Sequence, residues 1–229
     1  MKRSIGERYI EAALKRKNIA VIVAHPDDET LWCGGIMLMY TSNNWFIACL
    51  CRGKDADRAP KFKKALSAYG AEGKMGDLDD GPEQLPLEKE VVREAVLDLL
   101  PASGFDLVIT HNPFGEYTRH LRHEEIGGAV IGLWEEQKIR TNELWTFAYG
   151  DGHKKHYPRA MSAADLIQDL PVHIWKGKYR MITEVYGFDR KGFEARTTPR
   201  KEAFWKFGSS MQCRSWLKQG GTSNKAPII

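Results

Sequence analysis

The segment HPDDE (residues 25–29) places one histidine and three acidic residues directly after an apolar run at residues 19–24. Such a run is typical of a buried strand, and partly buried carboxylates that lie side by side repel one another unless a positive charge compensates them. A metal cation would supply that charge. His25 and Asp28 are three residues apart, so a turn or the start of a helix directs both side chains to one point. We therefore expect both to bind a metal ion.

A third ligand is expected from another strand end. The segment THNPFGEYTRHLRHEEIGG supplies His111, His120 and His123, and the last two lie three residues apart, as on one helical face. Two histidines and one carboxylate form a common catalytic zinc set that leaves a position for water. Zinc lowers the pKa of that water from 15.7 to about 7. Asp27 or Glu29 would then serve as general base, and a histidine that does not bind the metal would stabilise the oxyanion.

Structural interpretations of these residues compete with the catalytic ones. An acid at a helix start caps backbone N–H groups, which explains one acidic residue but not three beside a histidine. Two residues keep alternative interpretations. Glu29 either orients a metal ligand or is an ordinary acidic residue in the first turn of a helix. His111 either shapes the Asn-Pro turn or takes part directly in catalysis. His153 and His156, in GHKKHYPR, suggest a second metal site, but the neighbouring lysines favour a solvated loop.

The elements that must position these residues follow from apolar periodicity. Strands are predicted at residues 19–24, 45–51, 105–112 and 143–150, and helices at 30–41, 61–69, 87–100, 123–137 and within 172–188. This alternation predicts an α/β fold with a doubly wound, mostly parallel, Rossmann-like sheet covered by helices on both faces. Ligands of such sheets bind beyond the carboxyl ends of the strands. His25 and His111 each end a strand there, which places the active site at that edge.

Composition and length indicate one soluble domain over residues 1–229. We expect an amphipathic N-terminal helix within residues 1–17, and a C-terminal extension at 151–229 that forms a wall of the site.

The hydrophobic and charged fractions, 42% and 28%, are ordinary, and a net charge of +4 without a basic stripe gives no support for nucleic-acid binding. No apolar run reaches membrane-spanning length. The four cysteines are expected to be buried thiols of a cytoplasmic protein. The sequence leaves a homo-oligomer open.

Two motifs together carry a family resemblance. AHPDDE, followed about a hundred residues later by THNPFGEYTRHLRH, resembles the PIG-L/LmbE family of zinc-dependent N-deacetylases, over roughly residues 18–150. The resemblance implies a single LmbE-like deacetylase domain in which His25, Asp28 and His123 bind zinc. It also implies that Asp27 is the general base, and that His120 polarises the carbonyl or protonates the leaving amine.

The resemblance further implies a substrate class. The family acts mostly on N-acetylglucosaminyl groups, so the expected partner is a small amino-sugar conjugate, contacted by Arg58 and Asp80. The expected reaction is removal of an acetyl group by zinc-activated water, although such a site also accepts other divalent ions. The alternative is an amidase acting on another acylated amine, such as an antibiotic or thiol-conjugate intermediate.

Other function classes fit the sequence less well. A nucleotide-binding Rossmann protein is disfavoured, because no G-x-G-x-x-G follows the first strand. A non-catalytic carbohydrate-binding protein is disfavoured because it would not need both metal ligands and a base.

Overall fold

A central sheet organises the chain. The computed structural model describes residues 4–118 and 120–221. Over these residues, seven strands form one sheet in the order β3-β2-β1-β4-β5-β9-β8. The strands are β1 (Asn18–Val23), β2 (Asn44–Cys49), β3 (Glu72–Met75), β4 (Phe105–Thr110), β5 (Thr141–Phe147), β8 (Leu166–Asp169) and β9 (Lys201–Phe207). The first five pair in parallel, and β9 pairs antiparallel with both β5 and β8. The predicted mostly parallel α/β sheet is confirmed.

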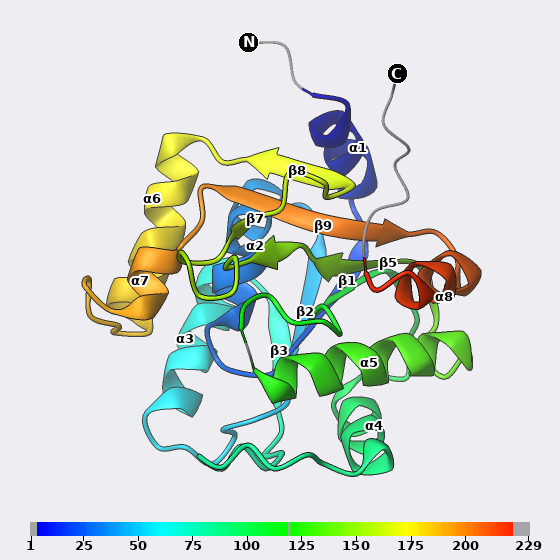
Figure 1. Ribbon diagram of the computed structural model, residues 1–229. Helices are drawn as coiled ribbons and strands as arrows, with labels where there is room; N and C mark the ends of the chain where they lie inside the picture. The colour runs from blue at the N-terminus through cyan, green and yellow to red at the C-terminus, as the bar shows by residue number, and fades with distance from the viewer. Residues whose placement is uncertain (1–3, 119, 222–229) are drawn as a thin grey trace.

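Helices cover both faces of this sheet. Figure 1 shows α3, α6 and α7 to one side of it and α4, α5 and α8 to the other. The helices are α1 (Ile5–Ala13), α2 (Asp28–Met39), α3 (Arg58–Tyr69), α4 (Lys89–Leu99), α5 (Leu121–Glu135), α6 (Val172–Arg180), α7 (Phe193–Thr197) and α8 (Ser210–Lys218), with a π-helical turn at Met181–Val185. Side chains of α2 and α3 belong to one hydrophobic core, and those of α4, α5 and α8 to a second.

Strand β1 divides these two cores. Its alternate side chains enter opposite cores, Ile19, Val21 and Val23 on one face and Ala20, Ile22 and Ala24 on the other. All six are fully buried, which explains why this segment is apolar without interruption rather than alternating. The strand therefore fixes the segment that follows it at the centre of the molecule.

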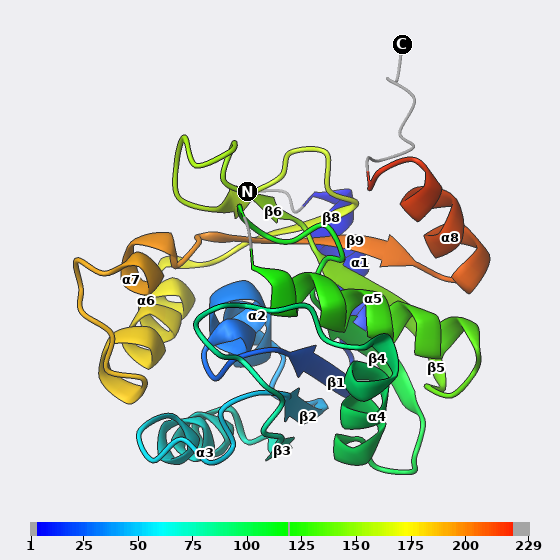
Figure 2. The same ribbon diagram turned by 60° about the horizontal axis from the view of Figure 1, so that its bottom comes forward.

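The strand order reverses between β1 and β4. From β1 the chain proceeds to β2 and β3 on one side, and then returns to place β4 and β5 on the other (Figure 2). In the register of the pair, Ile22 lies beside Thr110, so both strands end at the same level. His25 and His111 follow these two ends. This is the topological switch point at which open α/β sheets bind their ligands.

Parts of the architecture differ from the sequence-based expectation. The polar edge strand β3 and the antiparallel strands β8 and β9 were not predicted, so the segment at 151–229 contributes to the sheet itself. Helix α6 ends at Arg180 and continues as the π-helical turn. The N-terminal helix expected within residues 1–17 is present as α1, in which Ile10 is buried and Ile5 is 80% exposed.

Two global expectations concern the cysteines and the membrane. All four cysteines are buried free thiols, as predicted. Within residues 4–118 and 120–221, no helix combines the length and the apolar character needed to cross a bilayer.

Candidate metal centre

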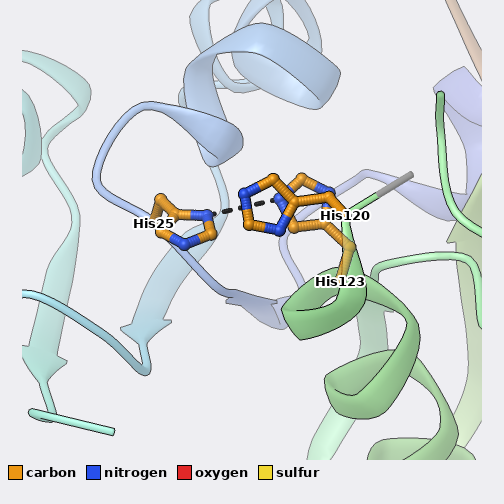
Figure 3. A group of neighbouring side chains, drawn as sticks. All are labelled: His25, His120 and His123. Carbon is orange, nitrogen blue, oxygen red and sulfur yellow. Dashed lines mark hydrogen bonds between the residues drawn. The ribbon is translucent and has the colours of Figure 1, made fainter. Parts of the chain in front are cut away.

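Three side-chain atoms converge at the switch point. His25 Nδ1 lies 3.2 Å from Asp28 Oδ2 and 3.3 Å from His123 Nε2, and the last two atoms are 3.3 Å apart. Zinc holds nitrogen and oxygen ligands at about 2.0–2.1 Å, so two ligands of a tetrahedral ion lie about 3.3 Å from each other. The three atoms therefore fit one face of a zinc tetrahedron. Figure 3 shows the two histidines approaching from separate parts of the chain.

Local structure brings these atoms together. His25 follows β1, Asp28 is the first residue of α2, and His123 lies in the first turn of α5. The Asp28 carboxylate accepts hydrogen bonds from the His25 backbone N–H (2.8 Å) and from the Trp32 indole (3.2 Å), which fix its orientation. Burial alone would raise the pKa of Asp28, but the neighbouring imidazoles of His123 and His111 hold it well below its usual range. The carboxylate is thus held in its ionised form.

The opposite nitrogens of both histidines face carboxylates. His123 Nδ1 lies 2.7 Å from Glu116 Oε2, and His25 Nε2 lies 3.2 Å from Asp80 Oδ1. Burial would raise the pKa of Glu116, but His111 and His123 lower it to about 2. A carboxylate behind a histidine fixes the tautomer and directs the other nitrogen to a metal. The contacts therefore turn His25 Nδ1 and His123 Nε2 toward the shared point, which supports the fit to a metal.

His111 supports this arrangement from behind. Its Nε2 accepts a hydrogen bond from the Ala24 backbone N–H (2.9 Å), and its Nδ1 lies 3.2 Å from Glu116 Oε1. The ring stacks on His123 with centroids 3.9 Å apart. Because His111 is fully buried and does not line the cavity described below, it holds Glu116 and His123 in place rather than facing a substrate.

Asp27 occupies a strained backbone position. Its φ of 126° is one that L-residues rarely adopt, and such strain persists only where the surroundings enforce it. Glu29 supplies part of that enforcement: its Oε2 accepts a hydrogen bond from the Asp27 N–H (3.1 Å), while Tyr186 and Thr30 hydroxyls donate to its Oε1. Glu29 is therefore a support for Asp27. Burial, Asp28 and Glu29 all raise the pKa of Asp27.

His120 lies beside the three converging atoms. It is the N-cap residue of α5, and its ring stacks on His123 with centroids 4.3 Å apart. Its Nδ1 is buried and has no hydrogen-bond partner among the described residues. Burial and the neighbouring His123 and His25 lower the pKa of His120 to about 3. One nitrogen from each of His25, His120 and His123 lies within 4.8 Å of the others, so His120 has the reach of an alternative ligand.

A cavity of about 420 Å³ opens over these groups; we call it the histidine cavity. Its walls include His25, Asp27, Asp28, Arg52, Arg58, Asp80, Tyr117, His120, Phe188, Phe193 and Glu194. His123 is fully buried and is not among the residues that line the cavity.

The two expected sugar contacts differ in their surroundings. The Arg58 guanidinium packs over the Phe188 ring at 4.4 Å, and both residues line the histidine cavity. Asp80 is more engaged, because its Oδ2 accepts hydrogen bonds from Arg52 Nε (3.0 Å) and Nη2 (2.7 Å) and its Oδ1 one from Gln84 (2.7 Å). Together with the His25 contact, this favours a positioning function for Asp80.

The loop that carries Asp80 is anchored to α5. The buried guanidinium of Arg122 donates from Nε to the Asp79 carbonyl (2.6 Å) and from Nη2 to the Leu85 carbonyl (2.7 Å), and it also pairs with Glu125. Arg122 directly precedes His123, so the same helix turn presents one histidine and fixes the loop behind the other. The sequence reasoning missed this arginine, Glu116 and Arg52. A search for an acceptor behind each candidate histidine would have drawn attention to Glu116.

The part of the sequence that contains these site residues matches a known protein family. Residues 20–134 match the family model described as GlcNAc-PI de-N-acetylase, PIG-L. The matched stretch holds His25, Asp28 and His123 together with Glu116. The chain belongs to the PIG-L family. The resemblance stated from the two sequence motifs is thereby confirmed.

Solved structures share the fold of this PIG-L member. N,N'-diacetylchitobiose deacetylase from Pyrococcus horikoshii, solved with its inhibitor MPG, is 15% identical with a TM-score of 0.65, and the match covers 100% of this chain and 98% of that one. A triple mutant of a deacetylase of teicoplanin biosynthesis is 14% identical with a TM-score of 0.54, covering 79% and 87%.

The fold also occurs with another reaction. GalB, the 4-carboxy-2-hydroxymuconate hydratase from Pseudomonas putida KT2440, is 16% identical with a TM-score of 0.52, and the match covers 91% of this chain and 92% of that one. A search of curated proteins found no match. Fold likeness alone therefore does not decide the reaction, and the site residues must carry that argument.

Proposed function

We propose that this PIG-L member is a metal-dependent hydrolase that removes the acetyl group from an N-acetylated amino sugar. His25, Asp28 and His123 would hold zinc or another divalent cation. The observation that carries the proposal is the triangle of 3.2, 3.3 and 3.3 Å between their three ligand atoms. Family membership supports the reaction, as do the neighbours whose names give diacetylchitobiose and teicoplanin deacetylases.

The chain's own residues would divide the remaining chemistry. When bound, zinc supplies an acidified water and a Lewis acid at the edge of the histidine cavity. The Asp27 carboxylate, which lines that cavity and is fixed through Glu29, accepts the proton of the attacking water. Asp27 then delivers this proton to the nitrogen of the departing amine. His120 donates a hydrogen bond to the substrate carbonyl oxygen as negative charge develops there. Asp80 and Glu116 hold the two histidine ligands in position.

The histidine cavity is suited to a small polar substrate. Its volume of about 420 Å³ lies within the range of about 300–1,000 Å³ that is usual for small-molecule sites. Arg58 would bind a sugar hydroxyl, and the aromatic faces of Tyr117 and Phe188 would contact the ring of the sugar. Buried polar groups discriminate strongly, because an analogue that lacks a hydroxyl leaves them unpaired. The four buried thiols agree with a cytoplasmic location, where cysteines stay reduced.

The alternative is an amidase acting on a different acylated amine. Such an enzyme would use the same metal and base, but it would not need a sugar ring beside Arg58. A simple N-acetyl amine separates the two: under our proposal its kcat/KM falls far below that of an N-acetylated amino sugar, whereas equal values favour the amidase.

Acetate release tests the proposal directly. Purified protein with its metal content measured is incubated with N-acetylglucosamine, diacetylchitobiose, N-acetylglucosaminyl conjugates and aminoglycoside precursors. We expect acetate in stoichiometric amounts with free amine from at least one of them, and release that is slower by about 10²–10⁴-fold from the matched variant Asp27→Asn. The same protein is incubated in parallel with an unsaturated acid, and water addition to that acid without acetate release from any of the sugars would instead indicate a hydratase.

A further inference from the structure

A second cavity adjoins the histidine cavity. It has a volume of about 670 Å³, and the two cavities share Tyr117, Phe193 and Glu194 as a common wall. Its other side is the loop between β6 (Tyr149–Gly150) and β7 (Arg159–Ala160), which lies beside α7 in Figure 1. We propose that this cavity, the Tyr157 cavity, binds an aromatic substituent on the sugar whose acetyl group is removed. This inference rests on the proposed deacetylase function.

Aromatic rings form the walls of the Tyr157 cavity. Phe193 lies between Tyr117 and Tyr157, with ring centroids 5.4 Å and 5.8 Å away. Although it is a large apolar residue, Phe193 is 39% exposed. The Arg196 guanidinium packs on the Tyr157 ring at 4.6 Å, which fixes that ring in place. A rigid row of aromatic faces with one ring open to solvent is suited to an aromatic ligand, because offset or edge-to-face rings attract beyond the area that they bury.

Three polar side chains of this cavity are committed to building the loop. The Asp151 carboxylate accepts hydrogen bonds from the Thr118 N–H (2.9 Å), the Thr118 hydroxyl (2.8 Å) and the His153 N–H (3.0 Å). His156 Nδ1 lies 2.8 Å from the carbonyl oxygen of Tyr157. Asp151, Thr118 and His156 are engaged with the protein, whereas Lys154, Lys155 and Glu194 are the charged residues that remain in the lining. The lining as a whole is nevertheless more apolar than polar, so the ring faces contribute much of the binding surface. This favours an aromatic group over a second sugar.

The backbone of the loop is held in an unfavourable conformation. Gly152, His153 and Lys154 have φ values of 61°, 59° and 66°, and the last two are L-residues in a region that favours glycine. The bonds from Asp151 to the segment before His120 keep this turn against the cavity. The loop is thus preorganised, which reduces the entropy that a ligand would lose on ordering it. Among the described residues, no group of potential metal ligands includes His153 or His156.

Aryl and methyl glycosides test the proposal. For the wild-type protein, we expect the 4-nitrophenyl β-glycoside of N-acetylglucosamine to exceed the methyl β-glycoside in kcat/KM by about tenfold, since burying and pairing one ring accounts for such a ratio. In Tyr157→Ala the ratio should fall to about one to two, with turnover of the methyl glycoside unchanged. Met211→Ala, which removes an exposed side chain on α8, is the matched control and should keep the wild-type ratio.

A binding measurement separates this inference from the proposed function. 4-Nitrophenyl β-glucoside has no acetyl group, so its dissociation constant, measured by calorimetry, reports on the Tyr157 cavity even if the protein is not a deacetylase. We expect it to bind about tenfold more tightly than methyl β-glucoside, and Tyr157→Ala to remove this difference. Equal binding of the two glucosides overturns the proposal, whether or not acetate is released. A stronger preference for diacetylchitobiose than for the aryl glycoside also overturns it, in favour of a second sugar.

Discussion

Replacing Glu116 by glutamine should weaken metal binding although no metal ligand is replaced. Glu116 is buried, and its carboxylate lies 2.7 Å from His123 Nδ1, 3.2 Å from His111 Nδ1 and 2.8 Å from the Asn112 N–H, which donates to it. Glutamine has nearly the same shape, but it carries no charge and has only one accepting atom. One of these N–H groups would then face an amide NH₂, and the orientation of His123 would be lost.

The magnitude follows from the bond that is lost. A hydrogen bond to a charged group contributes about 1.5–3 kcal/mol. Since about 1.4 kcal/mol is a factor of ten, the zinc dissociation constant should rise by about 10- to 150-fold. This agrees with the usual effect of removing a partner behind a ligating histidine, about 10- to 100-fold.

Competition with a chromophoric chelator measures this change. Zinc affinity of Glu116→Gln is compared with that of the wild type and of Glu135→Gln, a change at the far end of α5, and circular dichroism verifies that all three are folded. Wild-type zinc affinity in a folded Glu116→Gln would refute the idea that Glu116 orients His123.

Three further changes separate the expected functions of the cavity residues. Asp27→Asn should retain the metal but lower kcat by about 10²–10⁴-fold, the contribution of a positioned acid–base group, and loss of metal from this variant would show that Asp27 is a ligand. His120→Ala should also retain the metal and lower kcat by about 10²–10³-fold, the usual effect of removing one oxyanion donor. Normal turnover of this variant would contradict a catalytic role for His120, and loss of metal would show that His120 is a ligand. Asp80→Asn should lower zinc affinity, because Asp80 lies behind His25, whereas a rise in KM at unchanged metal content would favour the sugar contact expected from the sequence.

The convergence of the cavity residues could be predicted from the sequence because it depends on strand ends. An apolar run that ends in a histidine fixes where that histidine lies in a parallel sheet, and the switch point then brings the segments after β1 and β4 together. Asp28 and His123 are each within one turn of a helix start, so their positions follow from the same elements. These local rules are enough to place His25, Asp28 and His123 near one another.

Contacts between loops could not be predicted in the same way. Asp80 reaches His25 from a loop that Arg122 docks on α5, and Arg52 and Gln84 hold its carboxylate there. Nothing in the spacing of these residues indicates that arrangement. The φ of 126° at Asp27 depends on a buried glutamate held by Tyr186, which lies 157 positions from Glu29 in the sequence. Strands β8 and β9 escaped prediction because their pairing is antiparallel and joins the end of the chain to a sheet begun at Asn18.

The metal content of His123→Ala tests the central claim most directly. Wild-type protein and this variant are purified in parallel with His173→Ala, an exposed histidine on α6 as the matched control, and each is analysed for metal by mass spectrometry after dialysis. We expect about one divalent ion per chain in the wild type and the control, and little metal together with little acetate release in His123→Ala, because a site with two histidines and one carboxylate then loses one of its three protein ligands. Full metal content in a folded His123→Ala would contradict the assignment of His25, Asp28 and His123 as the metal site.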